Sequence, residues 1–133
     1  MSNKDIIDVI VRQHNTQKIA IKQLKIKSIH KDIIRLKQEN RNIGDKVRSI
    51  QTVIYKNVDK ACIVFIKDKL QQFHVYEDRV KRDHTTIDYL EKLQMINSIL
   101  INKHRSKVKS LRSELQELKK ELNVLGDMKG DIE

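Results

Sequence analysis

The clearest pattern along the chain is a heptad repeat of apolar residues in its second half. Steps of three and four residues, taken alternately backwards from Leu125, stay in phase as far as Cys62, and fourteen of the nineteen positions visited are apolar. This spacing places the visited side chains on one stripe of a helix, here called a seam, and predicts a long helix packed lengthwise on a partner helix. Polar interruptions of such a seam fix the register at some cost in stability. The interrupting residues are Lys69, Asp83, Gln94, Asn97 and His104.

A second seam occupies the first half of the chain, where only Asn40 interrupts it. Its positions are Ile26, Ile29, Ile33, Leu36, Asn40, Ile43, Val47, Ile50 and Ile54. Upstream, a weaker frame follows a different phase. Its positions are Ile7, Ile10, His14, Gln17, Ile21 and Leu24. The change of phase between Leu24 and Ile26 predicts a local change in supercoil.

Two helical stretches with apolar seams in one short chain pack most economically on each other. We therefore predict an all-α fold over residues 1–133, a single domain that forms an elongated antiparallel two-helix coiled-coil hairpin with room for a short helix at its tip. Composition supports this class. The chain has no proline, no tryptophan, three glycines and five Tyr or Phe residues, too few turn and strand formers for an all-β or α/β domain. Leu, Ile and Val make up about 30% of it, which argues against a disordered polyelectrolyte.

The position of the hairpin turn is less clearly marked. Gly44 is the only interior glycine, and Asp45 follows it as a candidate N-cap, so we favour a break at residues 42–45. Residues 57–60 are the rival, because a stutter there would carry one frame into the next. The favoured division is a first helix over about 3–41, a turn and short helix over about 42–57, a long helix over about 58–125 that Gly126 ends, and a frayed tail over 126–133. The two arms would then be unequal.

No segment of the sequence predicts membrane insertion or export through a signal peptide. The longest apolar run, residues 61–66, is far shorter than a bilayer span, and the N-terminal apolar stretch is too short for a signal peptide core. The single cysteine, Cys62, has no intrachain partner and is interpreted as an apolar helix residue. We expect a soluble, cytoplasmic protein.

Catalytic motifs are missing from the sequence. It contains no glycine-rich phosphate loop, no HExxH, and no two histidines four residues apart. Adjacent acids such as Glu77 and Asp78 cannot face each other on a helix, and a helical hairpin supplies no cleft that would raise a carboxyl pKa. We therefore expect no enzymatic activity, no cofactor and no metal.

Charge is distributed unevenly along the chain. The formal net charge is +10, and residues 12–41 hold nine basic and two acidic residues. Residues 103–112 hold five basic residues and no acid, whereas six acids against three bases follow from residue 113 onwards. In a hairpin, some of the excess basic residues can form ion pairs across the helices with Glu114, Glu117 and Glu121. The remainder favours an acidic partner or nucleic acid.

The layout resembles a known family. The segment Lys37-Gln-Glu-Asn-Arg-Asn-Ile-Gly-Asp, the amphipathic stretch Lys46-Val-Arg-Ser-Ile-Gln-Thr-Val-Ile-Tyr and the long heptad helix after them are similar to the type III secretion central stalk family, the FliJ/YscO-like group. The resemblance implies a coiled coil like the rotary-ATPase γ subunit. Its paired terminal helices would enter and stimulate a hexameric export ATPase, and its tip would reach towards the export gate. It also implies binding of secretion chaperones.

Candidate contact residues follow from that resemblance. The terminal arms would pair Ile6, Ile7, Ile10 and Ile21 with Leu111, Leu115, Leu118 and Leu122. The basic residues expected to contact an acidic ATPase channel are Arg12, Lys18, Lys22, Lys107, Lys109 and Arg112. The apolar residues expected at the tip, either to bind a partner or to cap the hairpin core, are Ile50, Val53, Ile54 and Tyr55.

Two other functions stay open. The chain can be a self-associating coiled coil that tethers or scaffolds other proteins, with Asn40, Asn57 and Asn97 fixing the register of identical neighbours. It can also be a coiled coil that binds nucleic acid without sequence preference. Against the latter, the sequence has no helix-turn-helix, no zinc-ligand spacing and no aromatic residues interleaved with its bases. Whether the protein is a monomer or a dimer separates the hairpin stalk from the tether.

Overall fold

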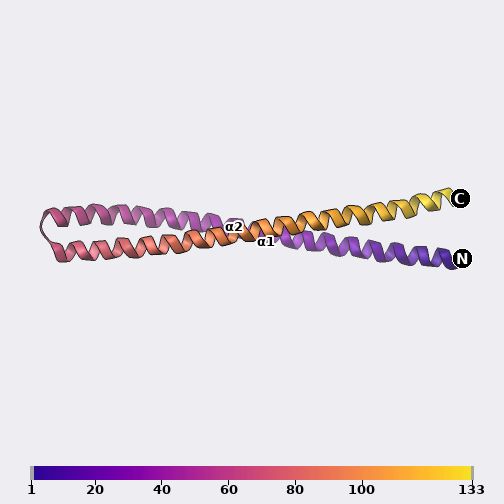
Figure 1. Ribbon diagram of the computed structural model, residues 1–133, viewed down its shortest axis with the longest axis horizontal. Coiled ribbons are helices and arrows are strands. Elements are labelled where there is room, and N and C mark those ends of the chain that lie inside the picture. Colours follow the sequence, from indigo (N-terminus) through magenta and orange to yellow (C-terminus); the bar gives the residue numbers. More distant parts are fainter. Residues whose placement is uncertain (1, 133) are drawn as a thin grey trace. The chain divides into compact units, whose positions relative to one another are not determined.

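The computed structural model contains two long α-helices that pack antiparallel (Figure 1). It describes the backbone of residues 2–132 and the side chains of residues 2–123. Helix α1 spans Asn3–Ile66 and helix α2 spans Leu70–Ile132, with 64 and 63 residues. The predicted all-α helical hairpin is confirmed. The expected inequality of its arms is wrong, because the turn lies near the middle of the chain.

The packing of the helices divides the chain into two units, and each unit contains a segment of both helices. Unit 1 consists of Met1–Ile34 and Asn102–Glu133, and unit 2 consists of Arg35–Ile101. Over the described residues, neither helix holds a stretch long and apolar enough to cross a membrane.

Both main seams pack inward as predicted. On α1 every seam position in residues 26–54 is buried or half-buried, and on α2 the same is true in residues 73–122. In unit 2 the core is formed by Val47, Ile54, Ile87 and Leu90, with Ile43, Ile50, Val80 and Leu93 packed against them. Three predicted α2 seam residues are exposed, because Cys62 and Ile66 belong to α1 outside its inward-facing stripe and Lys69 lies in the turn. Leu125 lies outside the described side chains.

The turn lies at residues 67–69. The helix does not break at residues 42–45 or at residues 57–60, the two positions predicted from the sequence. The α1 terminus closes as a Schellman motif, in which the Lys69 amide donates to the Val64 carbonyl at 2.9 Å and the Asp68 amide donates to the Phe65 carbonyl at 3.0 Å. Asp68 takes the left-handed conformation, with φ of 62°, at the position that glycine usually fills. Aspartate tolerates this conformation better than most residues. The turn therefore carries no glycine or proline signal.

Gly44 sits inside α1 without a positive φ. A Cβ built on Gly44 would lie 3.4 Å from Nε2 of Gln94, so the glycine leaves room for that side chain of α2. A glycine within a helix costs roughly 0.5–1 kcal/mol relative to alanine, which the packing of a long helix pair readily offsets. Asp45 pairs with Arg48 one turn along the same helix and does not cap a new one. Similarly, the backbone of α2 continues through Gly126, which was expected to end it, and Glu133 lies outside the described residues.

Helix α1 keeps one heptad phase instead of the two predicted. We call the inward-facing stripe of α1, over its whole length, the inner seam. Its positions upstream of Ile26 are buried or half-buried. They are Asp8, Arg12, Asn15, Ile19 and Lys22. The inner seam continues beyond Ile54 through Asn57, Ala61 and Val64. The expected phase change near Leu24 and the stutter considered as the rival at residues 57–60 are both wrong, because the helix is unbroken and stays in step with α2.

We expect Gly44→Ala to raise the free energy of unfolding by about 0.5–1 kcal/mol, because alanine favours the helix and the flexible end of Gln94 can move a few tenths of an ångström. Asp68→Gly should also stabilise the protein, since glycine adopts the left-handed conformation without strain. Thermal unfolding followed by circular dichroism checks both. If Gly44 were in a turn with positive φ, Gly44→Ala would lower the melting temperature instead.

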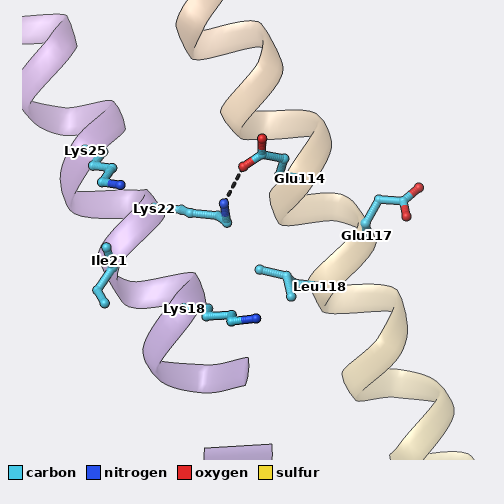
Figure 2. A pocket seen from close by; sticks show the side chains of 7 residues that line it. All are labelled: Lys18, Ile21, Lys22, Lys25, Glu114, Glu117 and Leu118. Atoms are coloured by element: carbon cyan, nitrogen blue, oxygen red, sulfur yellow. Dashed lines mark hydrogen bonds and ion pairs between the residues drawn. The ribbon is translucent and has the colours of Figure 1, made fainter. Parts of the chain in front are cut away.

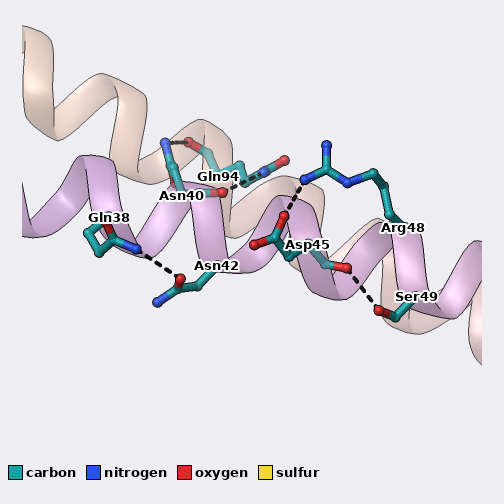
Figure 3. A network of polar contacts seen from close by, with 7 residues as sticks. All are labelled: Gln38, Asn40, Asn42, Asp45, Arg48, Ser49 and Gln94. Carbon is teal, nitrogen blue, oxygen red and sulfur yellow. Dashed lines mark hydrogen bonds and ion pairs between the residues drawn. The ribbon is translucent and has the colours of Figure 1, made fainter.

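A polar layer crosses the apolar core of unit 2 (Figure 3). Asn40 donates from Nδ2 to the Gln94 carbonyl at 3.3 Å, and Gln94 donates from Nε2 to the Asn40 carbonyl at 3.1 Å. Asn97 donates from Nδ2 to Asn40 Oδ1 at 3.0 Å. No buried side-chain nitrogen or oxygen among the described residues lacks a hydrogen-bond partner. The layer therefore gives the predicted polar interruptions a structural role, since it is satisfied only when these three residues are level with one another.

We expect Asn40→Leu to lower the free energy of unfolding by about 1–2 kcal/mol, because it removes interhelical hydrogen bonds and leaves Asn97 without its best acceptor. The double variant Asn40→Leu/Asn97→Leu should be more stable than this single variant, because two apolar groups then face each other. Chemical denaturation of both variants and of Asn97→Leu completes the double-mutant cycle. Strictly additive losses would show that the two asparagines do not act together.

Candidate functional site

The six basic residues predicted to contact an ATPase all lie in unit 1, which also contains both ends of the chain. Their surroundings differ. Arg12 and Lys22 are half-buried on the inner seam, whereas the other four are exposed. These four are Lys18, Lys107, Lys109 and Arg112. The exposed four are thus available to a partner, while Arg12 and Lys22 take part in packing the helices together.

Lys22 forms an ion pair with Glu114 across the two helices (Figure 2). The hydrogen bond from the Lys22 ammonium group, and then its charge, hold the pKa of Glu114 below its ordinary value. Burial opposes Lys22 with a smaller effect that raises this pKa, and the charges of Lys107 and Lys25 lower it by still smaller amounts. Glu114 thus pairs with a basic residue of the first helix, as the acidic C-terminal portion of the sequence suggested. Lys22 is therefore a poor candidate for a partner contact.

Two of the grooves along the described part of unit 1 contain the predicted basic residues. The first has a volume of about 470 Å³ and is lined by two apolar residues, Ile21 and Leu118, and by charged residues of both signs (Figure 2). These charged residues are Lys18, Lys22, Lys25, Glu114 and Glu117. Its mixed lining suits an amphipathic segment better than a simple anion.

The second groove, of about 480 Å³, is lined by basic and neutral residues only. Arg105, Lys109 and Arg112 follow one another at about one turn along α2, and a guanidinium nitrogen of Arg112 lies 3.3 Å from Nε2 of His30 on α1. Two arginines on one face can each hold a carboxylate through two parallel hydrogen bonds. Two of the predicted residues, Lys109 and Arg112, thus belong to a basic row that Arg105 and His30 complete. The composition of residues 103–112 pointed to Arg105, but nothing in the sequence indicated His30.

The predicted pairing of apolar residues in the terminal arms is not found. Leu111 and Leu115 are buried as expected, and Leu118 and Leu122 are half-buried. Ile6, Ile7, Ile10 and Ile21 are exposed instead of packing against them. The reason is the single phase of α1, which directs Arg12, Asn15 and Lys22 towards α2.

The residues predicted for the tip lie within α1, away from the turn. Ile54 is buried and Ile50 half-buried in the core of unit 2, whereas Val53 and Tyr55 are exposed on its surface. Ile50 and Ile54 therefore pack in the hairpin core, but they do not cap it, because they lie several turns of α1 away from residues 67–69. All four were assigned to the tip because the turn was placed too early.

An apolar surface at the actual turn was missed by the sequence analysis. Phe65 on α1 and Phe73 on α2 bring their ring centroids to 5.4 Å, and with Cys62 and Ile66 they line a groove of about 340 Å³. Ile66 is 82% exposed. In the sequence, one phenylalanine precedes Lys67-Asp68-Lys69 and another follows it. This pair would have indicated the apolar surface if the turn had been placed there. We call these four residues the tip cluster.

Cys62 is a free thiol on the surface of this tip cluster. Within the described residues, no group of three or more His, Cys, Asp or Glu side chains is arranged to hold a metal ion.

Comparison with known proteins adds no relative: no family model, no curated protein and no solved structure matches the chain. Functional inference therefore rests on the fold and on the surfaces of the two units.

We expect Glu114→Gln to lower the melting temperature slightly at pH 7, because it removes the ion pair with Lys22. A carboxylate with a lowered pKa contributes stability above its ordinary pKa, and this contribution is lost as the pH falls through the lowered value. The difference between variant and wild type should therefore shrink towards zero at pH 3. Glu117→Gln, in the same groove, is the matched control and should show a smaller difference at pH 7. An equal difference at both pH values would contradict the role of the charge.

Proposed function

We propose that this chain is a non-enzymatic central stalk or adaptor of a bacterial type III secretion export apparatus. In this role its paired terminal helices insert into a hexameric export ATPase at the cytoplasmic face of the apparatus and stimulate it. Two features support the proposal: the antiparallel hairpin, and the gathering of both chain ends with exposed basic residues in one unit. The fold is compatible with the FliJ/YscO-like group without being specific to it.

The observation that carries the proposal is the basic row of the second groove together with its neighbours. Arg105, Lys109 and Arg112 are exposed, and the groove that they line contains no acid. A stalk that turns or shifts within a channel needs contacts that re-form as it moves. Flexible cations on a helix surface meet that need, because their attraction to carboxylates is long-ranged and tolerates changes in geometry.

The tip cluster is the candidate for a second role, which is to contact an export gate protein or a secretion chaperone. Phe65 and Ile66 are more than half exposed, and exposed aromatic and aliphatic residues in a small patch are typical of protein-binding surfaces. This assignment replaces Ile50, Val53, Ile54 and Tyr55, which lie away from the turn.

We expect the triple variant Lys107→Glu/Lys109→Glu/Arg112→Glu to abolish stimulation of the export ATPase, because three charges in and beside the basic row change sign and the net charge falls by six units. Helicity should stay unchanged, since all three side chains are exposed. The measurement is phosphate release by the purified ATPase of the same organism with increasing amounts of each variant.

The matched control reverses three exposed lysines of unit 2, in Lys46→Glu/Lys56→Glu/Lys60→Glu, and should retain stimulation. Full stimulation by the first triple variant would sink the proposal. Static light scattering on the same samples tests the rival tether, because an obligate dimer with concentration-dependent melting is the behaviour expected of a self-associating coiled coil.

A further inference from the structure

Unit 1 leaves a second heptad seam of α1 facing outward. Its positions are Ile7, Ile10, His14, Gln17, Ile21 and Leu24, here called the outer seam. All six are exposed, and the exposed fractions of the four apolar residues are 58%, 58%, 53% and 66% in chain order. These residues are spaced by alternating steps of three and four, which is the spacing of a stripe that packs on another helix.

The outer seam lies almost opposite the inner seam around the helix. With 3.5 residues per turn, the centres of the two stripes are about 150° apart. Upstream of Ile26 every inner-seam residue except Ile19 is polar or charged, whereas the outer seam carries large aliphatic residues. This arrangement is the reverse of an ordinary surface helix, which buries its apolar stripe and exposes its polar one. An apolar stripe with helix-packing periodicity is thus left exposed among the residues of unit 1 whose side chains the structure describes.

We propose that the outer seam binds an amphipathic helix of another protein whose flanking residues are acidic. The charge of the residues beside the seam carries this choice. The flanking positions on the two sides of the seam are Lys4, Val11, Lys18 and Lys25, and Ile6, Gln13, Ala20 and Lys27. Four of the eight are lysines, all of them exposed, and none is acidic. Charges at flanking positions select helical partners by sign.

The same charges disfavour a second copy of this chain as the occupant. Two copies paired along their outer seams would offer each other only lysines and neutral residues at the flanks, in either orientation, so no lysine would gain an opposite charge there. An anionic lipid surface is also less suitable. His14 and Gln17 interrupt the stripe in the middle, and the opposite side of α1 already packs on α2.

The first groove gives the partner a place to anchor. Ile21 belongs both to the outer seam and to the lining of this groove, where Leu118 supplies a second apolar side chain (Figure 2). Its volume of about 470 Å³ has room for large side chains of a docked helix. Lys18 and Lys25 also line this groove. Because both flank the outer seam, they can pair with acidic flanking residues of the docked helix.

Three synthetic 28-residue peptides test the proposal against the full chain by fluorescence anisotropy. The acidic probe has four heptads with leucine at both seam positions and glutamate at both flanking positions. The basic probe carries lysine at the flanks, and the polar probe keeps glutamate but replaces leucine with serine. We expect the acidic probe to bind at least tenfold more tightly than either of the others, because binding needs both the apolar stripe and the opposite charge.

The variant Ile10→Gln/Ile21→Gln/Leu24→Gln should weaken binding of the acidic probe at least tenfold, with circular dichroism unchanged because the three side chains are exposed. The matched control Val53→Gln/Tyr89→Gln/Ile96→Gln removes three similarly exposed apolar residues of unit 2 and should bind like wild type. Lys18→Glu/Lys25→Glu/Lys27→Glu should reverse the preference towards the basic probe.

Four results would overturn the proposal: no binding of any probe, equal binding of the acidic probe by wild type and the outer-seam variant, equal binding of the acidic and polar probes, or a wild-type dimer that the outer-seam variant dissociates in light scattering. Binding to phosphatidylglycerol vesicles that depends on the outer seam, together with acidic-probe binding that does not, would also overturn it in favour of a membrane surface. These outcomes are independent of the proposed ATPase contact, which is tested at Lys107, Lys109 and Arg112.

Discussion

An unbroken helix can turn only one heptad stripe towards its neighbour, and this constraint governs the arrangement of α1. Over Asn3–Ile66 the helix contains no proline and no change of phase, so the residues that meet α2 are determined by where the strongest apolar stretch lies. That stretch is residues 26–54, whose core includes Val47 and Ile54. Residues upstream must follow the same phase even where their own pattern prefers another. The half-buried Arg12 and the exposed Leu24 are two results of this one rule.

Polar residues inside the seams act in different ways in the two units. In unit 2, Asn40, Gln94 and Asn97 satisfy one another and define which residues face each other across the helices. In unit 1, Lys22 reaches out of the seam to Glu114 at the surface, where solvent weakens the attraction between the charges. We infer that unit 2 specifies the pairing of the helices, while unit 1 depends more on Leu111, Leu115 and the continuity of both helices.

The helical class, the antiparallel pairing and most residues of both main seams could be predicted from the sequence, because the 3.5-residue repeat is sustained over many turns. The turn could not, since Asp68 takes a conformation for which glycine is the usual sequence signal, and Gly44 is tolerated inside a helix. The site was predicted in part. Four of the predicted basic residues are exposed in one unit: Lys18, Lys107, Lys109 and Arg112. His30 meets Arg112 only because the two helices pack together, which the sequence did not indicate. The outward direction of Ile21 depends on the phase of residues far along the helix, which no local pattern reveals.

The central position of the turn also orders the folding of the hairpin. Phe65 and Phe73 meet after closing a loop of a few residues, whereas the contact between Lys22 and Glu114 closes one of 92 residues. Loop closure entropy grows with that separation, so pairing is favoured to begin beside Asp68 and to proceed residue by residue towards the chain ends. The last pairs to form are also the first to open in local fluctuations. Among the described residues, those of unit 1, such as Lys22 and Glu114, thus form the helix pairs whose closure a bound partner can most easily shift.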